Sequence, residues 1–174
     1  MKQCTILFLA GLLLFTTLMG GSVFAQTKEP VDYTLPYPGI MIDNPLYVLK
    51  NFRDKIMELL IADPVKKVEF YILQSDKDWN AGILLDAKGK TALVVQTLTK
   101  GNTFSRNAVT IARTLEEQGK PVPQYVIDRL RNSLAKHGEV VSGLMSKPEE
   151  SQETGLAGVA AGVVALTEDV ANLK

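Results

Sequence analysis

Hydrophobic residues recur along most of this chain at spacings of three and four, the period of an α-helix with one buried face. Asn44 is a favourable N-cap, and Pro45 stands where a helix tolerates proline best, at its first position. The pattern predicts a helix over about 45–62, with one broad apolar face turned into a bundle. That face comprises Leu46, Leu49, Phe52, Arg53, Ile56, Leu59 and Leu60.

The pair Asp63-Pro64 repeats this start signal with almost no loop before it, which predicts a sharp corner and a second helix over about 64–88. This helix is apolar on two sides, so it belongs in the middle of a bundle. One stripe comprises Val65, Val68, Ile72, Ser75, Trp79 and Ile83, and the roughly opposite one Phe70, Leu73, Ala81 and Leu84.

Three more helices complete the predicted fold. Gly89 and Gly119 are stop signals on either side of a helix over about 90–118, in which a break at Gly101 is an alternative because glycine costs about 1 kcal/mol relative to alanine. A fourth helix begins near 121–123, and the segment 152–174 could form a fifth. Short connections between one-faced helices predict an all-α, antiparallel bundle of four or five helices.

The N-terminus has the pattern of a secretory signal peptide. Lys2 precedes an apolar run, and Val23 and Ala25 stand at the −3 and −1 positions of a cleavage site before Gln26. An uncleaved membrane anchor is the alternative. The predicted organisation is a signal peptide at 1–25, an extended lead at 26–44, a helical bundle domain at 45–145, and a loop with a C-terminal helix at 146–174.

Composition and charge argue against several classes of partner and site. Lys plus Arg and Asp plus Glu both number 19, and this balance argues against a nucleic-acid partner, which normally requires a basic excess. The one cysteine, Cys4, lies in the predicted signal peptide, so the mature chain has no thiol. The apolar part of 152–174 is too short to span a membrane, so no stable span is expected after processing.

No catalytic residue, cofactor site or metal site is predicted. The acidic residues Asp54, Glu58, Asp76, Asp78 and Asp86 are expected on solvated helix faces. Trp79 could be a ligand-stacking platform or a core anchor, and the single histidine, His137, could be a buried core residue or a functional acid, base or ligand. The candidate ligand pocket that follows lies between helices two to four and is lined by Trp79, Phe104, Tyr125 and His137.

Several blocks of the sequence resemble an uncharacterised family of exported bacterial and archaeal helical domains. That family has the pattern Pro-Gly, Pro-Leu-Tyr-x-Leu-Lys and Asp-Pro-x-Lys-Lys, to which Pro38-Gly39, residues 45–50 and residues 63–67 correspond. Lys88-Gly89-Lys90, and Lys136-His137 with Val140 and Val141, are also similar. The resemblance covers about 35–145 and implies an all-helical exported domain, without catalytic residues to transfer.

These observations favour a non-enzymatic interaction or structural module of the cell envelope, periplasmic or extracellular, whose partner is an unidentified envelope protein or polymer. A small-ligand-binding helical protein with a pocket near Trp79 is the alternative from another class. A hydrolase of cell-wall polymers is a third, and it would need carboxylates facing each other across a cleft.

Overall fold

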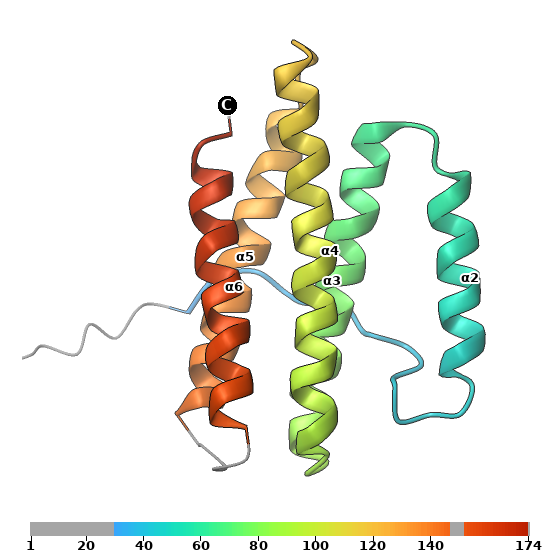
Figure 1. Cartoon of the computed structure of the whole chain (residues 1–174), viewed down its shortest axis with the longest axis vertical. Coiled ribbons are helices and arrows are strands. Elements are labelled where there is room, and N and C mark those ends of the chain that lie inside the picture. Colours follow the sequence, from blue (N-terminus) through green and yellow to red (C-terminus); the bar gives the residue numbers. More distant parts are fainter. Residues whose placement is uncertain (1–29, 147–151, 174) are drawn as a thin grey trace, which may run out of the picture.

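The computed structural model describes residues 30–146 and 152–173, which form five helices and no strand. The predicted signal peptide and its cleavage site lie outside the described residues. The chain is all-α, as predicted, and its successive helices run in alternating directions (Figure 1). The helices are α2 (Tyr47–Leu60), α3 (Pro64–Ala87), α4 (Thr91–Glu117), α5 (Gln124–Met145) and α6 (Glu153–Ala171).

The predicted stop signals between the helices are confirmed. Gly89 and Gly119 have φ values of 67° and 70°, a left-handed conformation that glycine adopts without strain. In each case the next residue donates its N–H back into the helix, from Lys90 to Leu85 at 2.9 Å and from Lys120 to Leu115 at 2.8 Å. These caps satisfy carbonyls that a helix end would otherwise leave without partners.

Of the two helix starts predicted from a capping residue followed by proline, one is confirmed and one is wrong. Asp63 caps α3 as expected, because its carboxylate accepts hydrogen bonds from the N–H groups of Val65 at 2.8 Å and Lys66 at 3.1 Å. The predicted start at Asn44-Pro45 is wrong by two residues. Asn44 instead accepts from the N–H of Leu46 within a turn, and α2 begins at Tyr47 without a side-chain cap.

The core is built by α3 to α6 in two apolar clusters. α3 packs against both α4 and α5, as its two apolar faces predicted, although Ile83 is exposed. One cluster includes Ile72, Leu130 and Leu166, and the other is centred on Trp79. Neither cluster contains a residue of α2.

The buried side of α4 is continuous, so the alternative of a break at Gly101 is wrong. Gly101 is buried because the Trp79 ring of α3 lies directly against it: a Cβ atom there would lie 2.8 Å from Cδ1 of the indole. The absence of a side chain at this position therefore lets α3 and α4 approach each other closely.

The segment 152–174 forms the predicted fifth helix, α6, over Glu153–Ala171. Its inward residues are those expected from the sequence: Leu156, Val159, Val163, Leu166 and Val170 are buried. The prediction that its apolar part is too short to span a membrane is wrong by length and composition, although a core helix can meet the same criterion. In this structure α6 packs against α4 and α5.

The lead before α2 crosses the bundle from α5 over α3 (Figure 1). The N–H of Val31 donates to Glu139 of α5 at 2.7 Å, and the Tyr33 hydroxyl donates to Asp76 of α3 at 2.6 Å. Farther along, the Asn80 side chain donates to the carbonyl of Pro36 at 2.9 Å. Residues 30–38 thus form no helix or strand and are tied to two helices.

Gly101→Ala is expected to lower the free energy of unfolding by about 1–3 kcal/mol, because the new methyl group overlaps the Trp79 ring. This loss opposes the gain of about 1 kcal/mol in helix propensity. Urea unfolding measures both effects together. Gly158→Ala in α6 is the matched control: it meets nothing within 4 Å and should stabilise the protein. A gain in stability for both variants would contradict close packing at Gly101.

Asp63→Ala is expected to lower the free energy of unfolding by about 0.5–2 kcal/mol, because two N–H groups of the first turn of α3 lose their acceptor. Asp63→Asn, which keeps an acceptor oxygen, should lose less. Asp32→Ala removes an exposed aspartate of the lead and serves as the control. Equal stability of all three variants and the parent would show that packing alone sets this corner.

Candidate functional site

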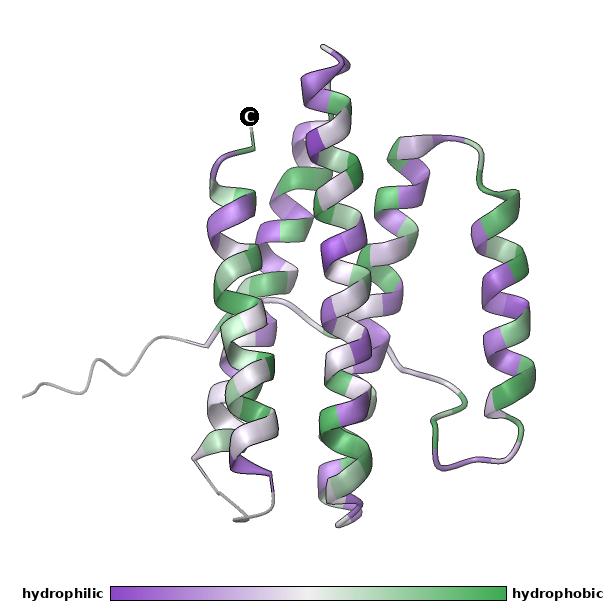
Figure 2. Ribbon diagram, in the orientation of Figure 1, coloured by the Kyte–Doolittle hydropathy of each residue, from purple (hydrophilic) through white to green (hydrophobic). Residues whose placement is uncertain are grey.

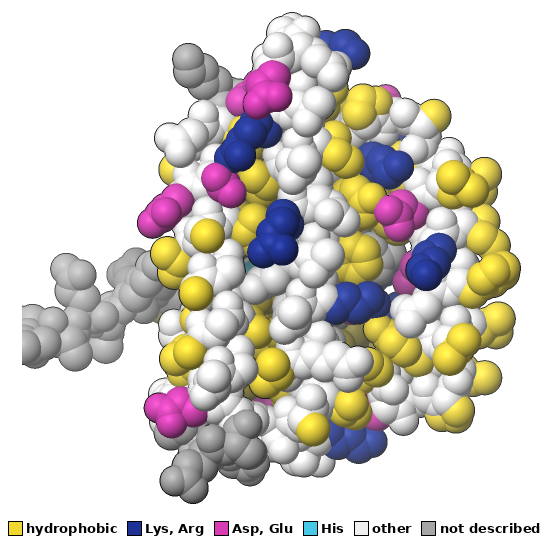
Figure 3. Space-filling model, viewed as in Figure 1, with side chains coloured by type: hydrophobic (Ala, Val, Ile, Leu, Met, Phe, Trp, Pro, Cys, Tyr) yellow, Lys and Arg dark blue, Asp and Glu magenta, His cyan; other side chains and the backbone are white. Residues whose placement is uncertain are grey.

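Helix α2 presents its apolar side to solvent. We call this side the outward face of α2 and define it by Val48, Leu49, Phe52, Ile56, Leu59 and Leu60, which are 43–83% exposed. Hydrophobic residues lie along the outer edge of this helix (Figure 2), and hydrophobic side chains are visible on the surface there (Figure 3). The prediction that the apolar face of this helix packs into the bundle is therefore wrong.

The side of α2 that faces the bundle is polar. Tyr47, Lys50, Asn51, Asp54 and Glu58 recur along it at helical spacing, and all five are buried or half-buried. Lys100 of α4 donates to the Tyr47 hydroxyl at 2.8 Å, and the Tyr71 hydroxyl of α3 donates to Glu58. Burial and the Glu58 carboxylate raise the pKa of Tyr71 to about 12. These partners are the physical reason for the orientation of α2.

A small charged cluster lies beneath the N-terminal end of α2. Lys50 is only 7% exposed and donates to the carbonyl of Pro38 at 3.2 Å, while Lys100 lies 3.5 Å from the buried carboxylate of Asp78. Burial lowers the pKa of Lys50. Burial also raises the pKa of Asp78, although the charges of Lys100 and Lys50 oppose it. For Lys100, burial lowers the pKa, but Asp78 and the Tyr47 hydroxyl together outweigh burial, so its pKa is raised.

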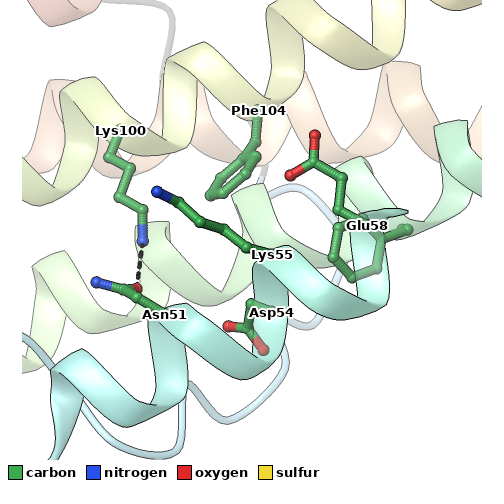
Figure 4. Close-up of a pocket in the computed structure, with 7 residues that line it drawn as sticks. Asn51, Asp54, Lys55, Glu58, Lys100 and Phe104 are labelled. Atoms are coloured by element: carbon green, nitrogen blue, oxygen red, sulfur yellow. Dashed lines mark hydrogen bonds between the residues drawn. The ribbon is translucent and has the colours of Figure 1, made fainter. Parts of the chain in front are cut away.

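A cleft of about 230 Å³ separates the middle of α2 from α3 and α4 (Figure 4). Its α2 side consists of Asn51, Asp54, Lys55 and Glu58, and the opposite side carries Phe70, Lys100 and Phe104. The aromatic rings form an apolar floor beneath charges of both signs. Such a cleft can hold a small molecule or water, but its walls contain no nucleophile activated by a base.

A second polar region lies in the centre of the bundle, around Asp76 of α3. One carboxylate oxygen accepts from the Ser133 hydroxyl at 2.6 Å and lies 3.1 Å from Nε2 of His137, both on α5. The other oxygen accepts from the hydroxyl of Tyr33. Burial and the Asp76 carboxylate raise the pKa of Tyr33 to about 12. The expectation that Asp76 and Asp78 are solvated is wrong: they are 0% and 3% exposed.

This network joins serine, histidine and aspartate, but its geometry is not that of a hydrolase triad. In a triad the histidine lies between the other two and withdraws the serine proton. Here Asp76 lies between Ser133 and His137 and accepts from the serine hydroxyl, and Ser133 is 1% exposed. The arrangement satisfies a buried carboxylate and offers no route for a substrate.

Trp79 and His137 stack on each other inside the core. Their ring centroids are 4.5 Å apart, the planes differ by 7°, and both side chains are fully buried. The contact of Nε2 with Asp76 indicates that this nitrogen carries the proton, because a carboxylate only accepts. Nδ1 is then left buried without a hydrogen-bond partner, and burial lowers the pKa of His137.

The four side chains grouped in sequence as one pocket occupy three places. Trp79 and His137 are stacked in the core, and Phe104 lies in the cleft beside α2. Tyr125 is 59% exposed at the start of α5. The structure does not bring the four together. Among the described residues, no group of three or more His, Cys, Asp or Glu is placed to hold a metal ion.

Two features of this region were not predicted from the sequence: the orientation of α2 and the burial of Asp76 and Asp78. A signal for Asp76 was present, because it follows Ile72 by four residues and precedes Trp79 by three, so it shares their buried face. For α2, the polar residues 47, 50, 51, 54 and 58 form a stripe as regular as the apolar one. Periodicity identifies two faces but does not say which one meets the bundle.

The stability of the protein is expected to fall as pH is lowered through about 6.5. Burial keeps the pKa of His137 below its ordinary value, so in this range the unfolded chain takes up a proton that the folded chain does not. The slope is at most about 1.4 kcal/mol per pH unit. His137 is the only histidine in the sequence, so His137→Gln should remove this slope while lowering stability overall.

Urea unfolding at a series of pH values between 7.5 and 5, roughly spanning the histidine range, measures this effect. The difference between parent and variant isolates His137 from the carboxyl groups. This matters because the raised pKa of Asp78 acts in the opposite direction: folded Asp78 binds its proton more readily and gains stability as pH falls. Identical pH profiles for parent and variant would contradict a buried, neutral His137.

Comparison with known proteins gives no independent guide to this region. No family model, curated protein or solved structure matches the chain. The resemblance to exported helical domains with the Pro-Leu-Tyr-x-Leu-Lys pattern therefore stays a prediction.

Proposed function

We propose that this protein is an exported, non-enzymatic interaction module of the cell envelope, and that it binds its partner through the outward face of α2. The observation that carries the proposal is the reversed orientation of this helix. Six large apolar side chains stand in solvent, while the polar side of the same helix has specific partners in the bundle.

Contiguous apolar surface of this kind is uncommon on a monomeric soluble protein and is typical of an interaction site. Burying one such side chain contributes about 1.5–3 kcal/mol. If α2 were rotated about its own axis, these side chains would be buried against the bundle and would stabilise the folded protein by this amount. The contacts of Tyr47, Lys50 and Glu58 prevent that rotation, so the apolar side stays available to a partner.

The export part of the proposal rests on residues 1–25, with their charged start, apolar run and Val23-x-Ala25 site. The non-enzymatic part is supported by the buried Ser133, Asp76 and His137, whose order and burial are unsuited to catalysis.

Small-ligand binding is a second candidate, and the cleft beside α2 favours it. The cleft is partly apolar through Phe70 and Phe104, and Lys55 and Lys100 could hold an acidic group. Of the four residues predicted for a ligand pocket, only Phe104 lines it. A ligand here would also contact the inward side of α2, leaving its outward face free.

A photo-crosslinking amino acid at Leu59 is expected to trap a partner in intact cells that express the full-length chain, because Leu59 is the most exposed residue of the outward face. The protein should be recovered from the envelope fraction with Gln26 as its first residue. The matched control carries the same amino acid at Tyr125, an exposed position on α5.

Adducts with protein or lipid should form from position 59 and not from position 125. Equal labelling from both positions, or none from position 59, would show that the outward face of α2 is not an interaction surface. Recovery of the protein from the cytoplasm would refute the envelope assignment separately.

A further inference from the structure

The outward face of α2 has a distinct arrangement of charge. Successive residues of an α-helix are rotated by about 100° around its axis. Lys55 therefore lies about 20° from Val48, at one edge of the apolar strip that forms the outward face, and Arg53 lies about 20° beyond Leu60, at the other edge. Both basic side chains are exposed, although Arg53 also pairs with Asp54 and Lys55 also lines the cleft beside α2 (Figure 4). The apolar strip is therefore bordered by cations on both sides.

The acidic residues of the same helix are placed away from this surface. The side chain of Asp54 is 14% exposed and lies on the bundle side, and Glu58 accepts from Tyr71 in the interior of the interface. Lys66 and Lys67, in the first turn of α3, follow directly after the corner that ends α2. An apolar strip with basic edges and inward acids is the pattern of a helix that lies in a lipid–water interface.

We propose that the outward face of α2 docks in the plane of an anionic lipid surface. The apolar side chains enter the boundary between headgroups and acyl chains, and Lys55 and Arg53 reach the headgroup phosphates from the two edges. This inference rests on the proposed function, because it names the partner of the same surface.

A lipid surface fits the charge of this face better than a second copy of the chain. Arg53 and Lys55 are exposed at its two edges, so packing two copies face to face would bring cations near cations in either orientation, and like charges disfavour such a contact. A helix in a lipid interface needs an apolar strip and basic edges, but no matching shape.

The attachment of α2 also suits such docking. The helix stands at the edge of the molecule with its outward side clear of the bundle (Figures 1 and 3). It is held at one end by Lys50 on the carbonyl of Pro38 and at the other by Glu58 with Tyr71. The strip can therefore meet a flat surface without unfolding of the bundle.

Co-sedimentation with vesicles tests the proposal. The protein is expressed from its full-length sequence and purified in the form that cells accumulate. It is then mixed with vesicles of equal parts phosphatidylglycerol and phosphatidylcholine, or of phosphatidylcholine alone. We expect binding to the anionic vesicles that weakens with salt, and much weaker binding to the neutral ones.

Two sets of variants locate the binding surface. The double variant Phe52→Gln/Leu59→Gln should reduce partitioning by at least about tenfold, since two apolar side chains no longer enter the lipid. Tyr125→Gln/Val164→Gln removes exposed apolar side chains from α5 and α6, and should bind as the parent does. Lys55→Glu should reduce binding to anionic vesicles by about fivefold or more, while Lys120→Glu should change it little.

Circular dichroism and unfolding curves establish that each variant is folded. Absence of vesicle binding by the parent overturns the lipid proposal, and so does equal binding by the parent and the α2 double variant. Self-association that the α2 double variant abolishes, without vesicle binding, would identify a second copy as the occupant and also overturn it. In these cases a specific crosslink from Leu59 in cells would still support the interaction surface, so the two proposals fail separately.

Discussion

The buried carboxylate of Asp76 constrains the rest of the structure. A carboxylate in the interior of a bundle must receive hydrogen bonds, because leaving one of its acceptors unsatisfied costs about 1–3 kcal/mol. Its donors come from Tyr33 in the lead and from Ser133 and His137 on α5. Any sliding of α5 along α3, or detachment of the lead, would break at least one of these bonds. The apolar clusters supply the driving force for folding, and Asp76 fixes the register in which they pack.

The orientation of α2 follows from the same constraint through the lead. Once Tyr33 is held at Asp76, the next residues pass over α3, where Asn80 donates to the Pro36 carbonyl. This places the carbonyl of Pro38 where Lys50 can donate to it. Lys50 and Lys100 then lie near the buried carboxylate of Asp78. The two aspartates of α3 thus position the lead and the polar side of α2, which leaves the apolar side of α2 facing solvent.

Much of the fold could be predicted from sequence because the responsible signals are local. Asp63 next to Pro64, and the glycines at 89 and 119, act within one helical turn, so they reveal helix ends without knowledge of the tertiary structure. The orientation of α2 could not be predicted, since it depends on partners such as Lys100 and Tyr71 that are distant in sequence. For the same reason Asp76 was expected in solvent. Its donors lie 43 to 61 residues away.

The composition of α2 therefore has to be explained by something other than the stability of the bundle. Helices α3 to α6 form both apolar clusters without any residue of α2. The hydrogen bonds that hold α2 each involve a charged group, Lys50, Lys100 or Glu58. Such bonds contribute about 1.5–3 kcal/mol each, but they are fewer than the six apolar side chains of the outward face. Each apolar side chain of the outward face would contribute about 1.5–3 kcal/mol of stabilisation if it were buried, and it contributes none of this while it remains in water. A helix retained only to stabilise the domain would have its apolar side inward. The arrangement observed gains this further stabilisation only if an apolar surface outside the molecule covers that side.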